Sequence, residues 1–292
     1  GGNAEPELQR QRRKCDGERR RDAFHDEFDG GTAIAHRLAE VAGEGMRDVG
    51  KVLVPDRSVE APGLAEGRDQ PGGVVGGDAL AIDISAGAGS HALLTTPGAG
   101  KWYRANGRVS RQDVRIDVGA GAALEWLPQE TLLYRDARVA LTHEVALAAD
   151  ARYLGSEILC FGRTASGEVF AEGAVRQIST IRRDGQLVWH EEGEIDGAGT
   201  GMHSPFGLGG NSVCATLIAC GLSLDASQLQ QLRQELDGAG GRSGATQLPA
   251  MVVVRHLGRS SEAARAVLLA AWCRLRPALL GREAAVPRLW TT

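Results

Sequence analysis

The sequence predicts a mainly β protein with two helices near its C-terminal end. Three observations support this fold class. Apolar and polar residues alternate in several segments after residue 71, glycine-rich joints separate these segments, and two later segments repeat apolar residues at helical spacing. Many short strands joined by frequent turns are typical of an all-β core, which could be a sandwich, a barrel or a β-helical stack.

The strands are predicted where every second residue is apolar. Val114, Ile116 and Val118 alternate with two charged residues, so one face of this strand is buried and the other is solvated. The alternating segments are 114–118, 139–145 and 175–181, and glycine joints occupy 87–89, 119–121 and 197–199. This spacing predicts short, half-buried strands throughout the second part of the chain.

Two helices interrupt the strand pattern. Residues 226–236 carry leucine at helical spacing after Asp225, which is a favourable N-cap. The second helix is predicted over residues 261–275, after a serine N-cap, and Pro277 should end it because proline lacks the N–H that helix propagation needs.

Composition separates residues 1–70 from residues 71–292. The first 70 residues hold 27 charged side chains, 12 basic and 15 acidic, against 43 in the remaining 222. They show no sustained apolar period, which predicts a poorly ordered segment, whereas residues 71–292 should form one domain. A basic tail for nucleic acid is disfavoured because the segment is net acidic.

Charge and hydropathy exclude further classes of protein. A formal net charge of −4 gives no reason to expect a nucleic-acid partner, and no run of 18 apolar residues indicates a membrane span. The first residues lack the layout of a signal peptide, so we expect a cytoplasmic protein. The five cysteines include no CxxC pair, which argues against a structural zinc site.

Possible catalytic motifs fail on spacing. The run 96–101 could suggest a phosphate-binding loop, but Thr95 stands where the first glycine is required and Trp102 stands where a serine or threonine should bind magnesium. The serine in 87–91 lacks the glycine spacing of a nucleophile elbow. Neither His143 nor His190 has a second histidine four residues later, so the zinc-protease helix is absent.

Three carboxylates stand in apolar or glycine-rich surroundings, namely Glu125, Glu130 and Glu168. A carboxylate removed from water needs a partner or an aqueous cavity. Pairing with arginine, for example Arg163 with Glu168, is one interpretation. Transient binding of a divalent cation by oxygen ligands is the other, and the residues leave both open.

Several runs resemble the UreD family of urease accessory proteins, also called UreH. The runs that carry the resemblance are 71–78 (PGGVVGGD), 94–104 (LTTPGAGKWYR), 124–130 (LEWLPQE), 162–168, 276–283 and 287–292. They follow one another over about 222 residues. The resemblance implies a β-helical, solenoid-like stack of short strands and a non-enzymatic role in the maturation of urease.

The resemblance also implies partners and a cargo. Members of the family bind the urease apoprotein and, with UreF and the GTPase UreG, help deliver nickel to the urease active site. No permanently bound cofactor is implied, and nickel is in transit through a water-filled passage. Spaced carboxylates, hydroxyls and water suit such a passage because nickel must be shielded yet released.

Two sets of candidate site residues follow from the matching runs. The positions expected along the passage are Asp78, Thr95, Thr96, Glu130, Asp136 and Glu168. Lys101, Trp102 and Tyr103 are expected to contact a partner, because aromatic residues and exposed loops concentrate at interfaces. Cation–π packing of Lys101 on its neighbours is the other interpretation.

Two alternatives remain open from the sequence. Residues 1–70 lack the opening strands of the family, so they form either a divergent extension or, as we favour, an out-of-frame translation of GC-rich DNA. Reading the other two frames upstream of Pro71 distinguishes these. For function, the alternative is an unrelated β-rich metal-dependent hydrolase, which would hold a metal permanently.

Overall fold

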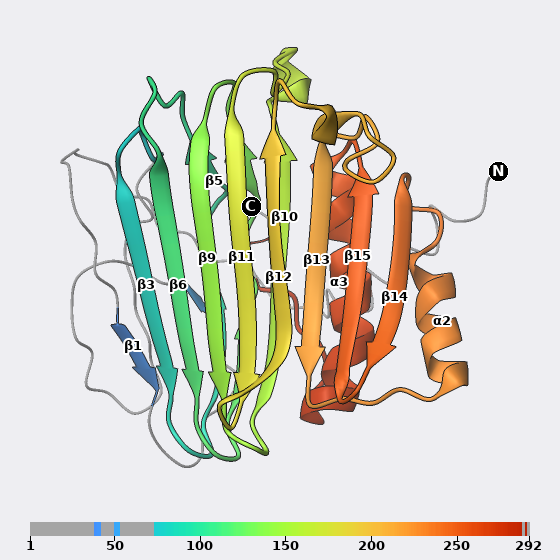
Figure 1. Ribbon diagram of the computed structural model, residues 1–292. Coiled ribbons are helices and arrows are strands. Elements are labelled where there is room, and N and C mark those ends of the chain that lie inside the picture. Colours follow the sequence, from blue (N-terminus) through green and yellow to red (C-terminus); the bar gives the residue numbers. More distant parts are fainter. Residues whose placement is uncertain (1–37, 42–49, 53–72, 288–289, 291–292) are drawn as a thin grey trace, which may run out of the picture.

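The structure is a computed structural model that describes residues 38–41, 50–52, 73–287 and 290. It contains two sheets facing one another, with helices beside the second sheet (Figure 1). The mainly β, solenoid-like fold with two C-terminal helices is therefore confirmed. Among the described residues, no helix is long and apolar enough to cross a membrane.

Each sheet combines solenoid strands with additional strands at its margins. The first sheet has the order β1 (Leu38–Val41), β3 (Ala79–Ala86), β6 (Ser110–Val118), β9 (Arg138–Leu147), β11 (Ala174–Arg183) and β12 (Gln186–Asp196). The second has the order β14 (Arg242–Leu248), β15 (Met251–Gly258), β13 (Val213–Cys220), β10 (Arg152–Phe161), β7 (Ala123–Trp126), β4 (His91–Thr95) and β2 (Gly50–Val52). Two short strands complete it, β5 (Gly100–Trp102) and β8 (Thr131–Leu133), which pair with one another.

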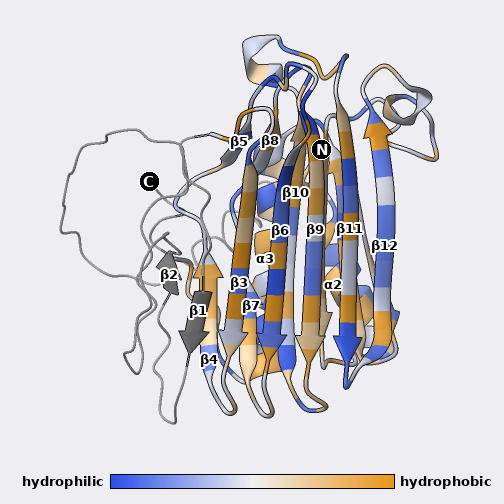
Figure 2. Cartoon of the chain, turned by 60° about the vertical axis from the view of Figure 1, so that its left-hand side comes forward, coloured by the Kyte–Doolittle hydropathy of each residue, from blue (hydrophilic) through white to orange (hydrophobic). Residues whose placement is uncertain are grey.

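The chain winds from one sheet to the other in three coils that begin with β3, β6 and β9. Strands of successive coils pair in parallel, so that Ile82 lies beside Val114 and Ile116 lies beside Val145. These apolar residues point between the sheets and form a buried core. The alternation is visible as orange and blue bands along β6, β9 and β11 (Figure 2). The period-two segments predicted from the sequence are therefore these strands.

The solenoid ends where the chain reverses direction. Residues Asp184 and Gly185 connect β11 to the antiparallel β12, and both have positive φ, 47° and 75°. Two such residues form the turn that matches strand twist in a tight hairpin. After β12, strands β13, β14 and β15 extend the second sheet with antiparallel pairing.

Helix α2 (Ala226–Leu236) packs against β14, and helix α3 (Ser261–Leu280) packs on β10, β13 and β15. Both predicted N-caps are confirmed, because the side chains of Asp225 and Ser260 accept hydrogen bonds from the first turns. Helix α3 covers a second apolar cluster on the outer face of the sheet.

The predicted end of the second helix was wrong. Pro277 lies inside α3, which continues to Leu280 and ends at Gly281 in the left-handed conformation. Leu279 and Leu280 are buried against the sheet. Their burial stabilises the last turn enough to outweigh the backbone hydrogen bond that Pro277 cannot donate.

We call the end of the solenoid where β3, β6, β9 and β11 begin the loop end. Two one-turn 3₁₀ helices lie in its loops, η1 (Thr164–Ser166) before β11 and η2 (Thr200–Met202) after β12. Both lie at the top of Figure 1. The opposite end consists mostly of short turns, such as Asp184-Gly185.

The first 70 residues contribute two short described strands. β1 pairs in parallel with β3, and β2 pairs in parallel with β4. The remainder of residues 1–70 lies outside the described residues, so the proposed division of the chain at residue 70 stays a prediction.

The glycine run before β3 allows two backbone segments to come close together. A Cβ atom on Gly76 would lie 2.0 Å from the carbonyl oxygen of Ala105. Gly76→Ala is therefore expected to lower the free energy of unfolding by about 1–3 kcal/mol, as overpacking does in protein cores. Urea unfolding measures this. Gly98→Ala is the control, because no atom lies within 4 Å there, and equal midpoints for both variants would contradict the prediction.

Candidate functional site

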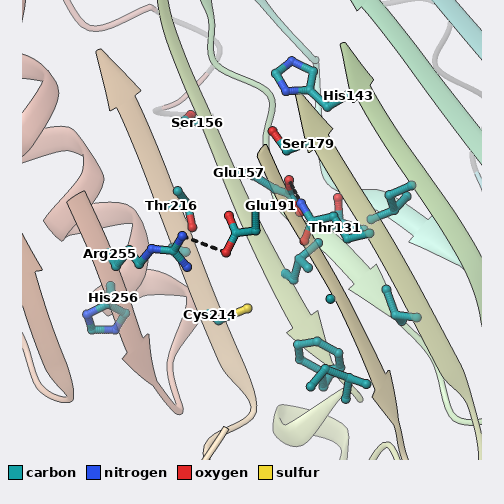
Figure 3. Close-up of a pocket in the computed structure, with 18 of the residues that line it drawn as sticks. Thr131, His143, Ser156, Glu157, Ser179, Glu191, Cys214, Thr216, Arg255 and His256 are labelled. Atoms are coloured by element: carbon teal, nitrogen blue, oxygen red, sulfur yellow. Dashed lines mark hydrogen bonds and ion pairs between the residues drawn. The ribbon is translucent and has the colours of Figure 1, made fainter. Parts of the chain in front are cut away.

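A cavity of about 790 Å³ lies between the two sheets. Its walls come from β6, β9 and β11 on one side and from β10, β13 and β15 on the other, and β12 lies along its margin. Polar side chains from both sheets point toward this space, among them Glu157, Ser179 and Thr216 (Figure 3). An internal space whose walls combine polar and apolar side chains differs from the apolar core on either side of it.

The period of two determines which side chains of β10 reach the cavity. Tyr153, Glu157 and Leu159 line it, whereas Leu154 and Ile158 point the other way and pack in the cluster beneath α3. Because the strand alternates, Glu157 occupies a position that would be apolar in an ordinary core. It faces Gln177 of β11, which is one of the polar residues on the opposite wall.

The carboxylate of Glu157 is only partly hydrogen bonded. The Gln177 side chain donates to Glu157 Oε2 over 2.5 Å, while Glu157 Oε1 is buried and has no hydrogen-bond partner. Burial and, to a smaller extent, the nearby Glu191 raise the pKa of Glu157 to about 7, against the effect of the Gln177 hydrogen bond. Near neutral pH this group is therefore divided between its protonated and its ionised form.

His143 supplies a neutral nitrogen group to the same space. Its Nε2 and the hydroxyl of Tyr153 lie 3.1 Å apart, in a hydrogen bond whose direction depends on the tautomer. Burial lowers the pKa of His143 to about 4, so the ring carries no charge at neutral pH. Cys214 is different, because burial raises its pKa to about 12 and keeps it a thiol.

An ion pair joins the two sheets at the margin of the cavity. Arg255 of β15 donates from Nη2 to Glu191 Oε1 over 2.7 Å, and the dashed line in Figure 3 marks this contact. The guanidinium also lies 5.7 Å from the ring centre of Trp189. Both contacts hold β12 close to β15, one of the antiparallel strands that extend the second sheet.

The cavity reaches the surface at the loop end. Its lining extends to Thr200, Ser204 and Phe206 in the loop between β12 and β13. The side chain of Phe206 is fully exposed. A residue that borders both the cavity and the solvent indicates an opening at this loop.

A smaller cavity of about 40 Å³ lies on the α3 side of the second sheet. Pro128, Gln129 and Ser156 line both cavities. At this point the sheet is interrupted, because β10 pairs with β7 up to Gly155 and with β8 only from Leu159. The break between these ladders brings the two spaces together.

Three of the predicted passage residues gather near this break. Thr96 lines the main cavity, and its Oγ1 accepts a hydrogen bond from the Gln129 backbone over 2.9 Å. Thr95 is buried and donates to the Leu127 carbonyl over 2.6 Å. Glu130 accepts from Arg265 of α3 through both carboxylate oxygens, one of them at 2.9 Å from Arg265 Nε.

The other three predicted passage residues, Asp78, Asp136 and Glu168, lie at the loop end. They are separate from the three residues near the break. Glu168 accepts hydrogen bonds from Arg163 Nη2 over 2.6 Å and from the Arg135 backbone over 2.9 Å. The Arg163–Glu168 pairing considered from the sequence is thus confirmed. The hydrogen bond from Arg163 lowers the pKa of Glu168.

Asp78 and Asp136 are also engaged by local groups. Asp78 accepts a hydrogen bond from the Val75 backbone over 3.0 Å. Asp136 Oδ2 lies 3.8 Å from Arg104 Nε, and its Oδ1 lies 3.7 Å from Arg138 Nε. Among the described residues, no group of three or more His, Cys, Asp or Glu side chains could hold a metal ion. The role of the six positions along a passage therefore stays a prediction.

Glu125 lies away from the cavity, in a buried polar cluster beneath α3. Its oxygens lie 2.9 Å from His91 Nε2, 2.7 Å from Trp272 Nε1 and 3.0 Å from Arg276 Nε. Burial raises the pKa of Glu125, but these hydrogen bonds outweigh it, so the pKa is below its ordinary value. Pairing thus explains this carboxylate as well.

The three residues predicted to contact a partner differ in their exposure to solvent. Lys101 is exposed and Tyr103 is half-buried against Tyr134, with ring centres 4.8 Å apart. Trp102 is only 2% exposed and belongs to the core beside the cavity. A contact with a partner stays a prediction for this run, and only Lys101 and Tyr103 are accessible for it.

Glu157, Gln177 and His143 were not predicted from the sequence as site residues. A signal for Glu157 was present, because it stands in phase with Tyr153 and Phe161 on the apolar face of an alternating strand. Gln177 and His143 stand in phase with Val175 and Val145 in the same way. Polar residues on the buried face of several neighbouring strands are the pattern that marks such a cavity.

Fold and site together define a β-solenoid scaffold that encloses a cavity with polar groups in its walls. A family model described as UreD urease accessory protein matches residues 68–291. The chain belongs to this family. Its members act in the assembly of the urease nickel centre and are not enzymes, which removes the hydrolase alternative.

Individual relatives agree with the family match. The chain is 52% identical over 272 residues to the urease accessory protein UreD of Janthinobacterium sp. (strain Marseille), covering 92% of this chain and 90% of that protein. That alignment is longer than residues 71–292 and so includes part of the first 70. UreD of Nitrosospira multiformis is 48% identical over 225 residues, covering 76% of this chain and 81% of that protein.

Proposed function

We propose that this protein binds the urease apoprotein and, together with UreF and the GTPase UreG, delivers nickel to the urease active site through its internal cavity. The observation that carries the proposal is the cavity of about 790 Å³ with the unpartnered carboxylate oxygen of Glu157 inside it. Membership of the UreD family supports the assignment of urease as the target.

The chemistry of the walls suits a cation in transit. Carboxylate, hydroxyl, amide and neutral imidazole groups bind a borderline divalent cation weakly and singly, whereas a cage of thiolates and histidines would retain it. Glu157, Ser179 and His143 present such groups. The cavity volume is many times the roughly 30 Å³ of one water molecule, so the ion could keep part of its hydration shell.

A route follows from the opening at the loop end and from the break beside Gln129, where the main cavity meets the smaller one. Nickel would enter or leave at the loop end, pass the layer that contains Glu157, and cross the break at Gln129. The candidate residues then fall at the ends of this route. Asp78, Asp136 and Glu168 lie at the loop end, and Thr95, Thr96 and Glu130 lie near the break.

Co-purification tests the partners directly. Tagged full-length protein is expected to retain urease subunits and UreF from a mixture that also contains UreG, and urease activated in its presence should gain nickel, measured by elemental analysis. Tight stoichiometric nickel on the isolated protein with no transfer to urease would contradict the proposal. Retention of neither urease nor UreF would contradict it equally.

The predicted passage residues can be tested as a pair. Replacing Glu130 and Glu168 together with alanine is expected to lower the nickel content of urease activated with the variant, because a carboxylate is lost at each end of the route. Glu192→Ala is the control, since Glu192 is exposed and paired with Arg176. Unchanged nickel content in the double variant would count strongly against these two positions.

A further inference from the structure

The loop end carries most of the exposed large apolar side chains of the described residues. Six such side chains are exposed, and four lie at this end: Val75 (51%), Val109 (49%), Val169 (63%) and Phe206 (101%). Val75, Val109 and Val169 precede β3, β6 and β11, whose parallel pairing puts their starts at one end. An apolar surface gathered in this way is typical of a protein contact.

The backbone around Phe206 is held in place, although its ring is fully exposed. Its backbone donates to the Ser204 hydroxyl over 3.2 Å, and the neighbouring Leu208 donates to the Gly201 carbonyl over 2.9 Å while its side chain is buried. A loop whose backbone is already ordered loses little backbone entropy on binding, and an exposed aromatic ring is a common interface anchor.

The same end has an excess of unpaired positive charge. Five exposed cations there have no acidic partner among the described residues: Lys101, Arg108, Arg111, Arg242 and Arg259. Three carboxylates at this end are engaged by arginines, Glu172, Glu168 and Asp136. Asp78, Asp196 and Glu262 have no cation partner among the described residues, but they are fewer than the five cations. On a chain of net charge −4 this is a local basic surface.

The opening of the cavity lies at the same end as the apolar and basic surface. Thr200, Ser204 and Phe206 line the cavity and belong to the loop that carries the exposed ring. A molecule bound on this end would therefore cover the opening. The second sheet reaches the same end through Arg242, the first residue of β14, and Arg259, which follows β15.

We propose that the loop end docks a protein partner whose face is acidic around an apolar pocket, with Phe206 inserted in that pocket and the cavity opening covered. This inference rests on the proposed function, since the partner is taken to be a protein of urease activation. A second copy of this chain fits less well, because two copies joined symmetrically would oppose the same basic surfaces.

Binding measurements on the full-length protein test the proposal. Urease apoprotein, UreF and UreG are presented singly and together, and the dissociation constant is measured for each. Phe206→Ala is expected to weaken one of these contacts by at least about tenfold, the loss typical of an anchor residue. Leu187→Ala is the matched control, because Leu187 is 53% exposed at the opposite end.

Charge reversal tests the basic surface independently. Arg108→Glu with Arg111→Glu should weaken the same contact and flatten its dependence on salt, because the partner face is acidic. Arg152→Glu, at the start of β10 at the opposite end, should leave it unchanged. All variants concern exposed side chains, and unchanged melting curves verify that they fold.

The outcomes separate this proposal from the proposed function. If the wild type binds a partner and Phe206→Ala binds it equally well, the docking face is wrong while the proposed function stands. If the wild type binds none of the three proteins, both are wrong. Loss of self-association alone, or loss of binding to phosphatidylserine vesicles alone, would assign this face to a second copy or to a membrane and overturn the proposal.

Discussion

Replacing Glu125 with alanine is expected to lower the free energy of unfolding by about 3–5 kcal/mol, the range found when one partner of a buried ion pair is removed. Glu125 is fully buried, and Arg276 is only 1% exposed. The variant leaves the guanidinium charge inside the molecule and also removes the acceptor of the Trp272 N–H. The effect is large because Arg276 loses this carboxylate and the Trp272 N–H loses its acceptor, and neither gains water in exchange.

Urea unfolding at neutral pH measures the difference. Glu192→Ala is the matched control, because Glu192 also pairs with an arginine but is exposed, and such pairs contribute about 0–1 kcal/mol. A loss below about 1 kcal/mol for Glu125→Ala would show that water enters beneath α3 and that the cluster is not buried in solution.

Replacing Glu157 with glutamine is expected to stabilise the protein, and more so at alkaline pH. The pKa of Glu157 is raised from 4.5 to about 7 in the folded state. Between these values the unfolded chain loses the proton while the folded chain keeps it, so the wild type loses stability as pH rises through this window. Above it the loss reaches up to about 3 kcal/mol, and glutamine avoids it.

Unfolding of both proteins at about pH 5 and about pH 8 checks this result. The difference should be below about 1 kcal/mol at the lower pH and grow toward the upper one. The same variant should lower the nickel content of urease, because an amide cannot replace a carboxylate as an anionic ligand. Glu192→Gln controls for loss of charge alone. A difference in stability that does not change with pH would contradict the raised pKa.

Strands and helices that depend on a local residue pattern could be predicted from the sequence alone. The alternation at 114–118, 139–145 and 175–181 predicted strands that became β6, β9 and β11, and two N-caps placed the helices. The β-helical winding came only from the family resemblance, because alternation is the same in a sandwich, a barrel and a solenoid.

The partners of the isolated carboxylates were not predictable in the same way. Arg265 lies 135 residues after Glu130, and Arg276 lies 151 residues after Glu125. In a chain rich in arginine, nothing local indicates which one a carboxylate will meet, whereas Arg163 and Glu168 are five residues apart and could be matched. The cavity could not be predicted for the same reason, because its walls come from strands that are distant in sequence and meet only in the folded solenoid.

The position of α3 determines when this protein can become stable during synthesis. The outer face of the second sheet carries Leu154, Ile158 and Leu217, which are covered by a helix that follows every strand the structure describes. While the nascent chain is still on the ribosome, that face has no cover and can associate with other nascent chains. Folding yield in a cell should therefore depend on how quickly residues 261–280 emerge and dock.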